Sequence, residues 1–505
     1  MTIVNTNIAA LSAQSSMYKN TKEMESAMAK LSSGLRINNA ADDAAGLSIS
    51  QRLESQATGL SQAIRNAEDA QNMIDTIEGA HAEIVNSLQR LRELAVQSAN
   101  STNSAVDRSF INKEASQLLT EINRISTNTE WNGMVVMDGS FDDKNIQTGA
   151  NVNQVITVDV SDTQASNIGS YVIRGAASNS AEAAAPAANG ISASSTVIAG
   201  FAGTKTITTA ADDTAKEFVD DVNAVSDNTG VTAKAVTRAI LQSLSATGSV
   251  TIAIGKQGAV GTGTATQSTV TATISDVTDL TALRDAINEV AGGTGVVATL
   301  FEGDTSKVLL TDHDGDDIVL GDFNHSTGSA TINSQAYNFH GVSAASASTL
   351  ETLVQGGSDS ATVHGEVLLS SNQAFAITGS AQGEFFGGSG STTAAFQSSL
   401  EKVGDIDLGT MVGAQKALDV IDGAIDNINN QRADLGAISN RLDKTINNLT
   451  NVVENTQASK SHIQDANFAS ETSKLTKAQI LNQAATSMLA QANASKQTVL
   501  ALLQN

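Results

Sequence analysis

Residues 49–91 read ISQRLESQATGLSQAIRNAEDAQNMIDTIEGAHAEIVNSLQRL, and this stretch decides the fold class of the 505-residue chain. Its apolar side chains recur every seven residues in two rows that are offset by four, which is the pattern of a coiled-coil helix. Gln56 and His81 interrupt the two rows. The rows contain Leu53, Leu60, Ala67, Ile74 and Leu88, and Ile49, Ala63, Ala70, Ile77, Ile84 and Leu91.

The C-terminal part of the chain has the same seven-residue pattern. Arg432 and Ser439 break the second of its rows. The rows contain Ile421, Ile428, Leu435, Leu442 and Leu449, and Leu418, Ile425, Ile446 and Val453. A final segment continues the pattern with Leu481, Met488, Ser495 and Leu502 in one row and Ala485, Ala492 and Val499 in the other.

Such narrow apolar rows need a partner, because a buried Leu or Ile contributes about 1.5–3 kcal/mol only when another surface covers it. Since the rows lie at both ends of the chain, the partner is the other terminus or another copy. An ordinary bundle of amphipathic helices is the alternative that periodicity leaves open. We therefore predict a mainly α fold, with an antiparallel helical coiled-coil bundle formed by both termini and α+β or β outer domains in the middle.

Composition excludes several classes of protein. The chain has no cysteine, which excludes disulfide scaffolds and thiolate metal sites. Its 53 Asp and Glu outnumber its 29 Lys and Arg, and residues 175–400 hold 22 of these acidic residues against seven basic ones. No nucleic-acid partner is expected, because binding to phosphates requires a basic surface.

The first residues lack the features of a classical signal peptide. The first charged side chain is Lys19, and polar residues separate the apolar ones before it, so that neither a basic region nor an apolar core is present. No stretch approaches the roughly 20 apolar residues of a membrane helix, so no membrane partner is expected. The chain is then either cytoplasmic or exported by a route that reads another signal.

The termini resemble bacterial flagellin over roughly 1–175 and 400–505. The motifs that carry the resemblance are MTIVNTNIAALSAQ at the start, KLSSGLRINNAADDAAGLSIS from Lys30, LQRLRELAVQSANSTNS from Leu88, NGMVV from Asn132, and the run from Asn440 that begins NRLDKTINNLT and ends LALLQ. They occur in the family's order and at both ends of the chain.

The resemblance implies a structural subunit that polymerises with itself into the helical filament used for swimming motility. Contacts of a repeating, non-closing kind generate such filaments. Segment 31–46 would join the inner helix to the outer bundle, although a plain polar loop would read the same way. Residues 1–30 and 456–505 are weakly hydrophobic, so we expect them to be disordered in the monomer and to order on assembly.

The resemblance also implies an export route and several partners. Flagellins leave the cell unfolded through the flagellar type III apparatus, which makes the protein secreted. Hook-associated and cap proteins are implied partners, together with a flagellin-specific export chaperone that binds about 464–505. The side chains that this chaperone would cover are Leu481, Met488, Leu489, Val499 and Leu502.

One recognition surface is implied by the match of residues 88–97, LQRLRELAVQ, to the stretch that the flagellin-sensing Toll-like receptor binds. Arg90 and Glu114 could equally be solvated charges on helix surfaces. The closing Val499, Leu500, Leu502 and Leu503 similarly resemble the end that cytosolic inflammasome receptors sense. The implied Toll-like receptor contacts are Gln89, Arg90, Leu94, Gln97 and Glu114.

The middle of the chain contains an internal repeat. Residues 215–233 recur as 280–298 at an offset of 65, which aligns Asn223 with Asn288 and Gly230 with Gly295. The spacing predicts a short helix followed by a Gly turn into a strand, similar to the insertion motif of flagellin and hook-associated proteins.

The expected domains follow from these patterns. A low-complexity linker surrounds Pro186. The divisions are inner helices at 1–45 and 456–505, a helical bundle with a small β element at 46–177 and 398–455, the linker at 178–195, and outer modules at 196–265 and 266–397.

Candidate chemistry is sparse. TDHDGDD at 311–317 is either an oxygen-rich calcium loop or, as we prefer, an acidic turn between two strands, because it lacks EF-hand spacing. No two of the six histidines lie four residues apart, which excludes the zinc-protease helix found in some flagellins. Phosphate-binding and nucleophile-elbow motifs are also absent. We therefore predict no enzyme activity, no metal and no cofactor.

Two alternatives to a filament subunit remain. A hook-filament junction protein shares terminal sequence with flagellin but occurs in few copies. A soluble coiled-coil adhesin or enzyme would need a site in 196–395 that the sequence does not reveal. The match of LQRLRELAVQSANSTNS and of the last twenty residues favours the filament subunit.

Overall fold

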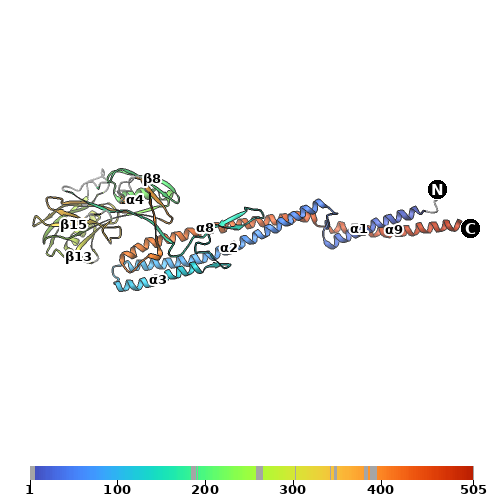
Figure 1. Ribbon diagram of the computed structural model, residues 1–505, viewed down its shortest axis with the longest axis horizontal. Helices are drawn as coiled ribbons and strands as arrows, with labels where there is room; N and C mark the ends of the chain where they lie inside the picture. Colours follow the sequence, from blue (N-terminus) through green and yellow to red (C-terminus); the bar gives the residue numbers. More distant parts are fainter. Residues whose placement is uncertain are drawn as a thin grey trace. The chain divides into compact units, whose positions relative to one another are not determined.

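The computed structural model describes residues 6–182, 189, 191–257, 266–301, 303–341, 343–345, 348, 350–379, 385–386 and 395–503. Pro186, within the expected linker, lies outside these residues. The chain divides into two compact units, of which the first comprises 1–75, 143–159 and 435–505 and the second comprises 76–142 and 160–434. Long terminal helices and a strand-rich middle confirm the predicted fold class (Figure 1).

Local sequence signals start and stop the helices. A capping box begins α3, in which Asp107 N donates to Ser104 Oγ (3.2 Å) and Ser104 N donates to Asp107 Oδ2 (3.0 Å). Gly34 ends α1 in the left-handed conformation that glycine adopts without strain. The helices are α1 (Ile8–Ser33), α2 (Ala44–Ser98), α3 (Ala105–Asn128), α4 (Ala215–Ala224), α5 (Ser226–Thr229), α6 (Thr281–Thr294), η1 (Val403–Asp405), α8 (Met411–Gln464) and α9 (Phe468–Leu503).

The strand pairings in the described part of the chain are antiparallel. The strands are β1 (Glu130–Trp131), β2 (Met134–Val135), β3 (Lys144–Gln147), β4 (Val155–Val158), β5 (Gly169–Arg174), β6 (Ser178–Glu182), β7 (Ser194–Gly200), β8 (Gly203–Thr209), β9 (Thr232–Gln242), β10 (Gly248–Gln257), β11 (Thr266–Ile274), β12 (Val297–Phe301), β13 (Asp304–Asp312), β14 (Asp317–His325), β15 (Thr331–Ala336), β16 (Glu351–Val354), β17 (Ser360–His364), β18 (Glu366–Ser371), β19 (Ala376–Gly379), β20 (Phe396–Gln397) and β21 (Ser399–Lys402).

In the first unit the helices pair antiparallel. α1 and α9 lie side by side (Figure 1). Asn482 Nδ2 donates to Thr21 Oγ1 (3.1 Å), whereas near the start of α1 Asn7 Nδ2 donates to the Ala492 carbonyl (3.1 Å). Sequence numbers therefore rise along one helix as they fall along the other.

The first unit also contains parts of α2 and α8, and these pair in the same antiparallel sense. Gln71 Nε2 donates to Asp443 Oδ1 (2.6 Å), and Glu54 forms an ion pair with Lys460. Strands β3 and β4 pair as a hairpin, which Asn66 of α2 holds through the Gln147 carbonyl (3.1 Å). The hairpin is the part of the predicted β element that belongs to this unit.

The segment 31–46 is held to the connection between α8 and α9. Arg36 N donates to the Gln464 carbonyl (2.7 Å), and Ala466 N donates to the Gly34 carbonyl (2.9 Å). Backbone N–H groups of Asn39 and Asn38 donate to Asp42, and these bonds lower the pKa of its carboxyl. The segment is thus a polar loop with a fixed position against the C-terminal helices.

In the second unit α3 returns along α2, and α8 runs antiparallel to α2. Arg92 Nε contacts Asp422 Oδ1 (2.6 Å), and further along Arg432 Nη2 contacts Glu78 Oε1 (2.6 Å). Directly after α3 in the sequence, β1 and β2 form a tight hairpin. Its turn, Asn132-Gly133, has positive φ at both residues, which is the geometry that an Asn-Gly pair favours.

The strand-rich part of the second unit forms three larger sheets. Their strand orders are β20-β19-β7-β8, then β11-β10-β14-β17-β6, and β12-β13-β9-β18-β5-β21 with β15 on β9 and β16 on β15. This part has two apolar cores, and the residues of one lie on both sides of most of the other in the sequence. One is centred on Phe218 of α4, and the other on Leu283 and Ile287 of α6.

The same structural module occurs twice in this part. In one copy the β7–β8 hairpin and α4 are followed by β9, which pairs with β18, and β19 returns to β7. In the other, the paired strands β10 and β11 and helix α6 are followed by β12, which pairs with β13, and β14 returns to β10. The second copy lies between β9 and β18 in the sequence, so it is inserted into the first.

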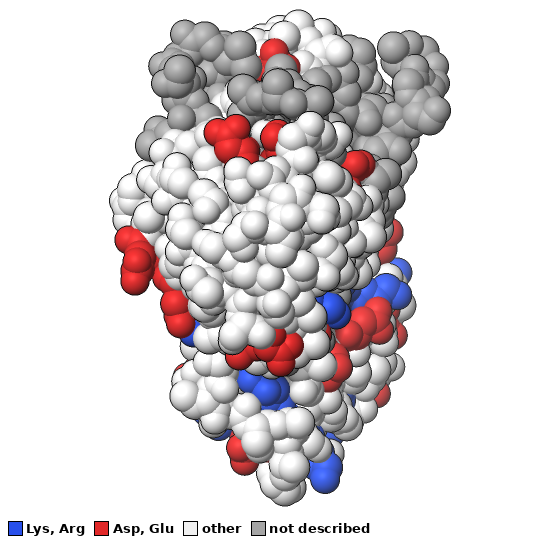
Figure 2. Space-filling model, turned by 90° about the vertical axis from the view of Figure 1, so that its left-hand side faces the viewer, with Lys and Arg blue, Asp and Glu red and all other residues white. Residues whose placement is uncertain are grey.

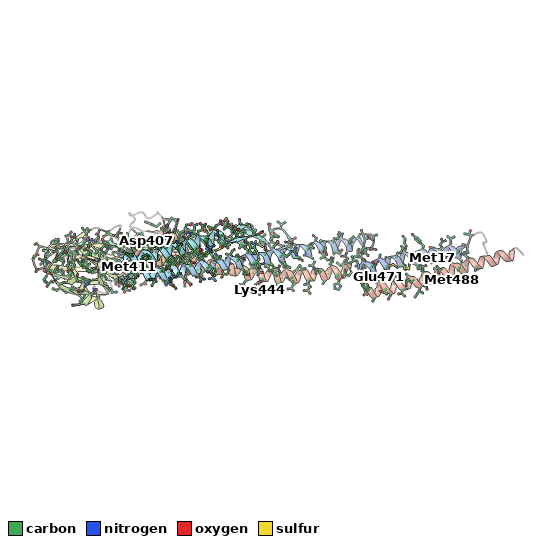
Figure 3. The ribbon with its side chains drawn as sticks, turned by 90° about the horizontal axis from the view of Figure 1, so that it is seen from below. Met17, Asp407, Met411, Lys444, Glu471 and Met488 are labelled. Carbon is green, nitrogen blue, oxygen red and sulfur yellow. The ribbon has the colours of Figure 1, made fainter. Side chains whose placement is uncertain are left out.

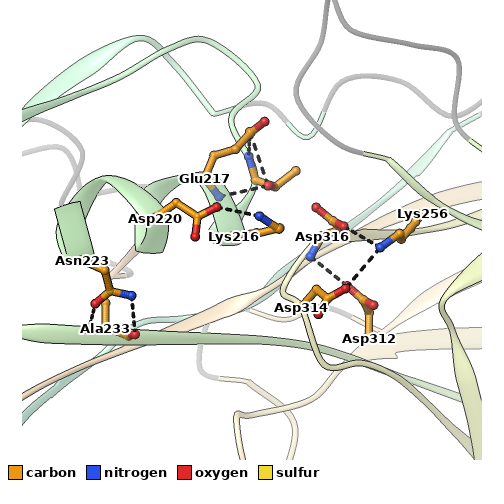
Figure 4. A network of polar contacts seen from close by, with 10 residues as sticks. Lys216, Glu217, Asp220, Asn223, Ala233, Lys256, Asp312, Asp314 and Asp316 are labelled. Atoms are coloured by element: carbon orange, nitrogen blue, oxygen red, sulfur yellow. Dashed lines mark hydrogen bonds and ion pairs between the residues drawn. The ribbon is translucent and has the colours of Figure 1, made fainter.

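Hydrogen bonds repeat at the predicted offset of 65. Asn223 donates to the Ala233 carbonyl (3.1 Å) and accepts from the Ala233 N–H (2.9 Å), a clamp drawn in Figure 4. Asn288 makes the same two bonds to Ala298, each at 2.8 Å. With Gly230 and Gly295 both left-handed, these bonds confirm the predicted helix, Gly turn and strand.

Candidate assembly surface

The predicted rows of α2 are buried from Leu60 onward. Leu53 is half-buried and Ile49 is exposed, so the closely packed part of the seam begins after the first heptad. Ala63, Ala67 and Ala70 are buried where large residues would keep helices apart. The fully covered large side chains are Leu60, Ile74, Ile77, Ile84, Leu88 and Leu91.

In α8 the first predicted row is buried, and the second is displaced by one residue in its first two heptads. Leu418 and Ile425 are half-buried, whereas Ala417 and Ala424 are buried. The small residues face the core because they permit close helix packing, and this corrects a row assigned by side-chain size. The buried members of the first row are Ile421, Ile428, Leu435 and Leu442, with Leu449 half-buried.

His81 sits within the α2 seam as a buried polar residue. Its side chain is fully covered, and neither ring nitrogen has a hydrogen-bond partner among the described residues. Burial lowers the pKa of the imidazole to about 4, with Glu78 opposing and Arg432 adding to the effect. The ring is therefore neutral at pH 7 and occupies an apolar position of the heptad.

The paired terminal helices cover small side chains and expose large ones. Along α9, Ala478 and Ala485 are buried, whereas Leu481 is 39% and Met488 64% exposed (Figure 3). Side chains after Ser495, including those of Val499, Leu500, Leu502 and Leu503, lie outside the described part. The exposed large apolar side chains of the two helices are Ile8, Leu11, Tyr18, Met28, Phe468, Ile480, Leu481 and Met488.

The candidate receptor surface lies on α2 and α3 of the second unit. Arg90 binds Glu114 Oε1 (2.8 Å) and Glu93 Oε2 (2.7 Å), and these hydrogen bonds raise the pKa of its guanidinium. Gln89 and Gln97 are exposed beside them. Leu94 is only 1% exposed. It packs inside the bundle, which corrects its assignment as a contact residue.

Sequence analysis missed a group of exposed apolar side chains near the same helices. Val106 and Phe110 of α3 are more than half exposed, as is Val96 of α2. The Lys113 ammonium lies 5.5 Å from the centre of the Phe110 ring. These residues fall outside the predicted heptad rows, and that position is the signal that could have indicated an outward surface.

The acidic loop at 311–317 crosses between sheets, because β13 and β14 do not pair with each other. Lys256 Nζ contacts Asp316 (2.9 Å) and Asp314 (3.4 Å), as Figure 4 shows. Burial raises the pKa of Asp312 to about 6. Within the described ranges no three His, Asp or Glu side chains gather in a way that could hold a metal ion.

Two other surface properties bear on partners. The strand-rich part of the second unit shows scattered carboxylates and few basic side chains on the face in Figure 2, in line with its acidic sequence. None of the helices in the described part of the chain is long and apolar enough to cross a membrane.

Comparison with known families identifies three regions. The bacterial flagellin N-terminal helical region matches residues 4–142, and the bacterial flagellin C-terminal helical region matches residues 418–503. The flagellin hook IN motif matches residues 249–311, which contain β11, α6 and β12 of the second copy of the module. The two helical regions thus coincide with the ends that carry the heptads.

Similar proteins match over their whole length. B-type flagellin of Pseudomonas aeruginosa is 36% identical over 507 residues, covering 99% of both chains. Flagellin of Salmonella rubislaw is 34% identical with 99% of each chain covered, and flagellin A of Vibrio anguillarum is 32% identical with 100% covered. A solved flagellar hook associated protein-3 from Legionella pneumophila shares 13% identity at a TM-score of 0.34, covering 82% of this chain and 98% of that one.

Full-length relatives above 30% identity, together with both terminal regions, decide between the alternatives. The chain therefore belongs to the bacterial flagellin family, whose members are structural subunits of the extracellular flagellar filament and not enzymes.

Proposed function

We propose that the large apolar side chains exposed on α1 and α9 are the surface through which copies of this flagellin pack into the filament. The observation that carries the proposal is the exposure of Leu11, Leu481 and Met488 on helices that already pair with each other. Each such side chain contributes about 1.5–3 kcal/mol once covered. A second copy provides the cover that the single chain lacks.

Electron microscopy of seeded elongation tests this proposal. The intact chain should extend short filament fragments into long filaments. The chain without residues 481–505 should not extend them, because it lacks one of the two apolar surfaces. Removal of 196–395 should leave elongation intact, since the heptads and terminal regions lie outside it. Filaments from the chain without 481–505 would contradict the proposal.

We further propose that 1–45 and 456–505 are disordered in the free monomer and become ordered on assembly. In support, α1 covers little of its own apolar surface, and Ala27 is its one fully buried side chain among the described residues. A lone helix of this kind is marginal in water. Hydrogen exchange of both segments should be fast in the monomer and slow in filaments.

The partners beyond the filament itself are also proposals. Export unfolded through the type III apparatus, with a chaperone on 464–505, agrees with the exposure of Leu481 and Met488, which need cover before assembly. Leu489, Val499 and Leu502 complete the proposed chaperone segment. Hook-associated and cap proteins would meet the same terminal helices at the filament ends. Binding of the purified chaperone to residues 464–505 alone is the direct test.

We propose the exposed residues Gln89, Arg90, Gln97 and Glu114 as contacts for the flagellin-sensing Toll-like receptor. The Arg90–Glu114 ion pair supports this, because it holds both side chains at one surface. Arg90→Ala should weaken receptor activation by the monomer without changing its thermal unfolding. The closing residues 499–503 are the proposed signal for cytosolic inflammasome receptors.

We propose that the inner helices at 1–45 and 456–505 and the bundle at 46–177 and 398–455 are separate domains. The linker is shorter than the expected 178–195, because β6 pairs with β17 and β7 begins at Ser194. For the outer modules, the pairings of β10 with β11 and of β9 with β18 support a second module that begins near Gly248, ends before β18 and is inserted into the first, rather than a single boundary at 265/266. Limited proteolysis should then cut between modules before it cuts within either one.

A further inference from the structure

A groove between α1 and α9 is lined by four lysines and two carboxylates, so its net charge is positive. It measures about 460 Å³, and Lys22 and Lys30 of α1 face Lys474 and Lys477 of α9 across it. Its carboxylates are Glu23 and Glu471, and Glu471 is buried and paired with Lys474 (2.6 Å) (Figure 3).

The lysines are incompletely neutralised within one chain. Lys22 lies over the Tyr18 ring at 5.4 Å, and neither Lys22 nor Lys477 forms an ion pair with any described residue. Asp42 interacts with Lys30 only weakly, as the last of the causes that lower its pKa. Four ammonium groups line one groove, so they repel one another, most strongly at low ionic strength. An acidic surface placed over the groove would remove this repulsion.

Charge is distributed along the chain in a way that supplies such a surface. Segments 1–45 and 456–505 together contain eight Lys and Arg and six Asp and Glu, so basic residues are in slight excess there. Residues 46–455 contain 21 Lys and Arg and 47 Asp and Glu, so acidic residues are in large excess. On α2 of the same unit, Glu68 and Asp75 are exposed and form no ion pair among the described residues. They lie seven residues apart, which places both on one face of the helix.

We infer that the lysine groove between α1 and α9 binds the Glu68 and Asp75 face of α2 from a second copy of this chain. The inference rests on the proposed function, since it concerns contacts within the filament. Neither carboxylate lines the groove within one chain, so the contact joins different subunits. It fixes the register of neighbouring copies, a role for which charge complementarity is better suited than apolar contact.

A charge swap tests the inference. The variant K22E/K477E should raise the critical concentration for seeded elongation roughly ten-fold at low ionic strength, as two repulsive contacts replace two attractive ones. Adding E68K/D75K in the same chain should restore elongation. High salt should reduce the difference between wild type and K22E/K477E. K205E/K307E, with the same change in net charge on β8 and β13, is the matched control and should elongate as wild type.

The outcomes of the elongation experiment distinguish a failure of the proposed function from a failure of the inference. If wild type does not elongate, the proposed function and the inference that rests on it both fail. If wild type elongates and K22E/K477E does so equally, the groove binds no acidic partner and the inference alone is wrong. If K22E/K477E is impaired and the swap does not rescue it, α2 of a second copy is not the partner. Unchanged thermal unfolding of the monomer shows that the rest of the fold is intact in each variant.

Discussion

Replacing Glu366 with Gln should make the stability of the second unit less dependent on pH. Glu366 begins β18 and is only 4% exposed, and its Oε2 accepts a hydrogen bond from Phe339 N (2.7 Å). Burial raises the pKa of this carboxyl to about 7. Arg174 acts in the opposite direction, but its guanidinium is engaged by both oxygens of Glu401 (2.9 and 3.0 Å).

The sign and size of this pH dependence follow from the difference between the pKa of Glu366 in the folded state, about 7, and its ordinary value of 4.5. Because the folded state holds the proton more strongly, Glu366 stabilises it below pH 4.5, and this contribution is lost as pH rises through about 7. Each pKa unit corresponds to about 1.4 kcal/mol, so the full effect is about 3 kcal/mol. Most of it falls between about pH 5 and pH 8.

The assay is urea unfolding of wild type and Glu366→Gln monomers across that range, with hydrogen exchange of β9 and β18 as a local readout. The wild type should lose about 3 kcal/mol relative to the variant as pH rises, because Gln does not titrate. Burial lowers the pKa of His340 to about 4, which gives the opposite trend below pH 6.5, but His340 is present in both proteins and cancels. A constant difference between the two proteins at every pH would refute the reasoning.

Three other perturbations test the packing. Ile77→Ala should lower the free energy of unfolding by about 2–5 kcal/mol, because the Ile77 side chain is fully buried. Thermal unfolding measures this loss, and a loss below about 1 kcal/mol would show that the side chain lies outside the core. His81→Leu should add about 1–3 kcal/mol to the free energy of unfolding, because it removes two buried nitrogens that have no hydrogen-bond partner among the described residues. It should also abolish the loss of stability expected as pH falls from 6.5 to about 4, because the lowered pKa keeps the folded ring neutral over that range. Unchanged acid sensitivity of the variant would contradict this. Replacing 237–365 with Asn-Gly should keep the Phe218 core folded and filaments intact, because that core takes no residue from the excised segment. Hydrogen exchange and electron microscopy measure the two outcomes. Loss of protection in α4 would show that the first copy of the module depends on the inserted second copy.

Features that depend on neighbouring residues, or on a repeat within the sequence, could be predicted from the sequence. The rows through Ile77 and Leu435 follow from their seven-residue spacing, and the Asn132-Gly133 turn follows from its residue types. The helix and Gly turn around Asn223 followed from an internal repeat. In each case the signal is local, because neighbouring residues alone decide which face is apolar or which backbone angles are allowed.

Features that depend on distant residues could not be predicted. The insertion of one module into another rests on β9 pairing with β18, and no local signal indicates that pairing. The buried position of Ala417 in α8 depends on how closely a partner helix approaches, and side-chain size suggested Leu418 instead. Leu94 was assigned to the receptor surface by resemblance, but its side chain is buried inside the bundle. The Glu366 site draws on separate strands and a loop, none of which carries a motif.

The use of small and large side chains on α9 connects its fold to its function. Towards α1 the helix covers Ala478 and Ala485, which permit close approach but contribute little stabilisation because they bury little apolar area. The larger Leu481 and Met488 remain exposed until another copy covers them. The buried side chains of this pairing are small, so we propose that most of the stabilisation of α1 and α9 becomes available only in a polymer. On this proposal, folding of the termini and growth of the filament are one coupled process.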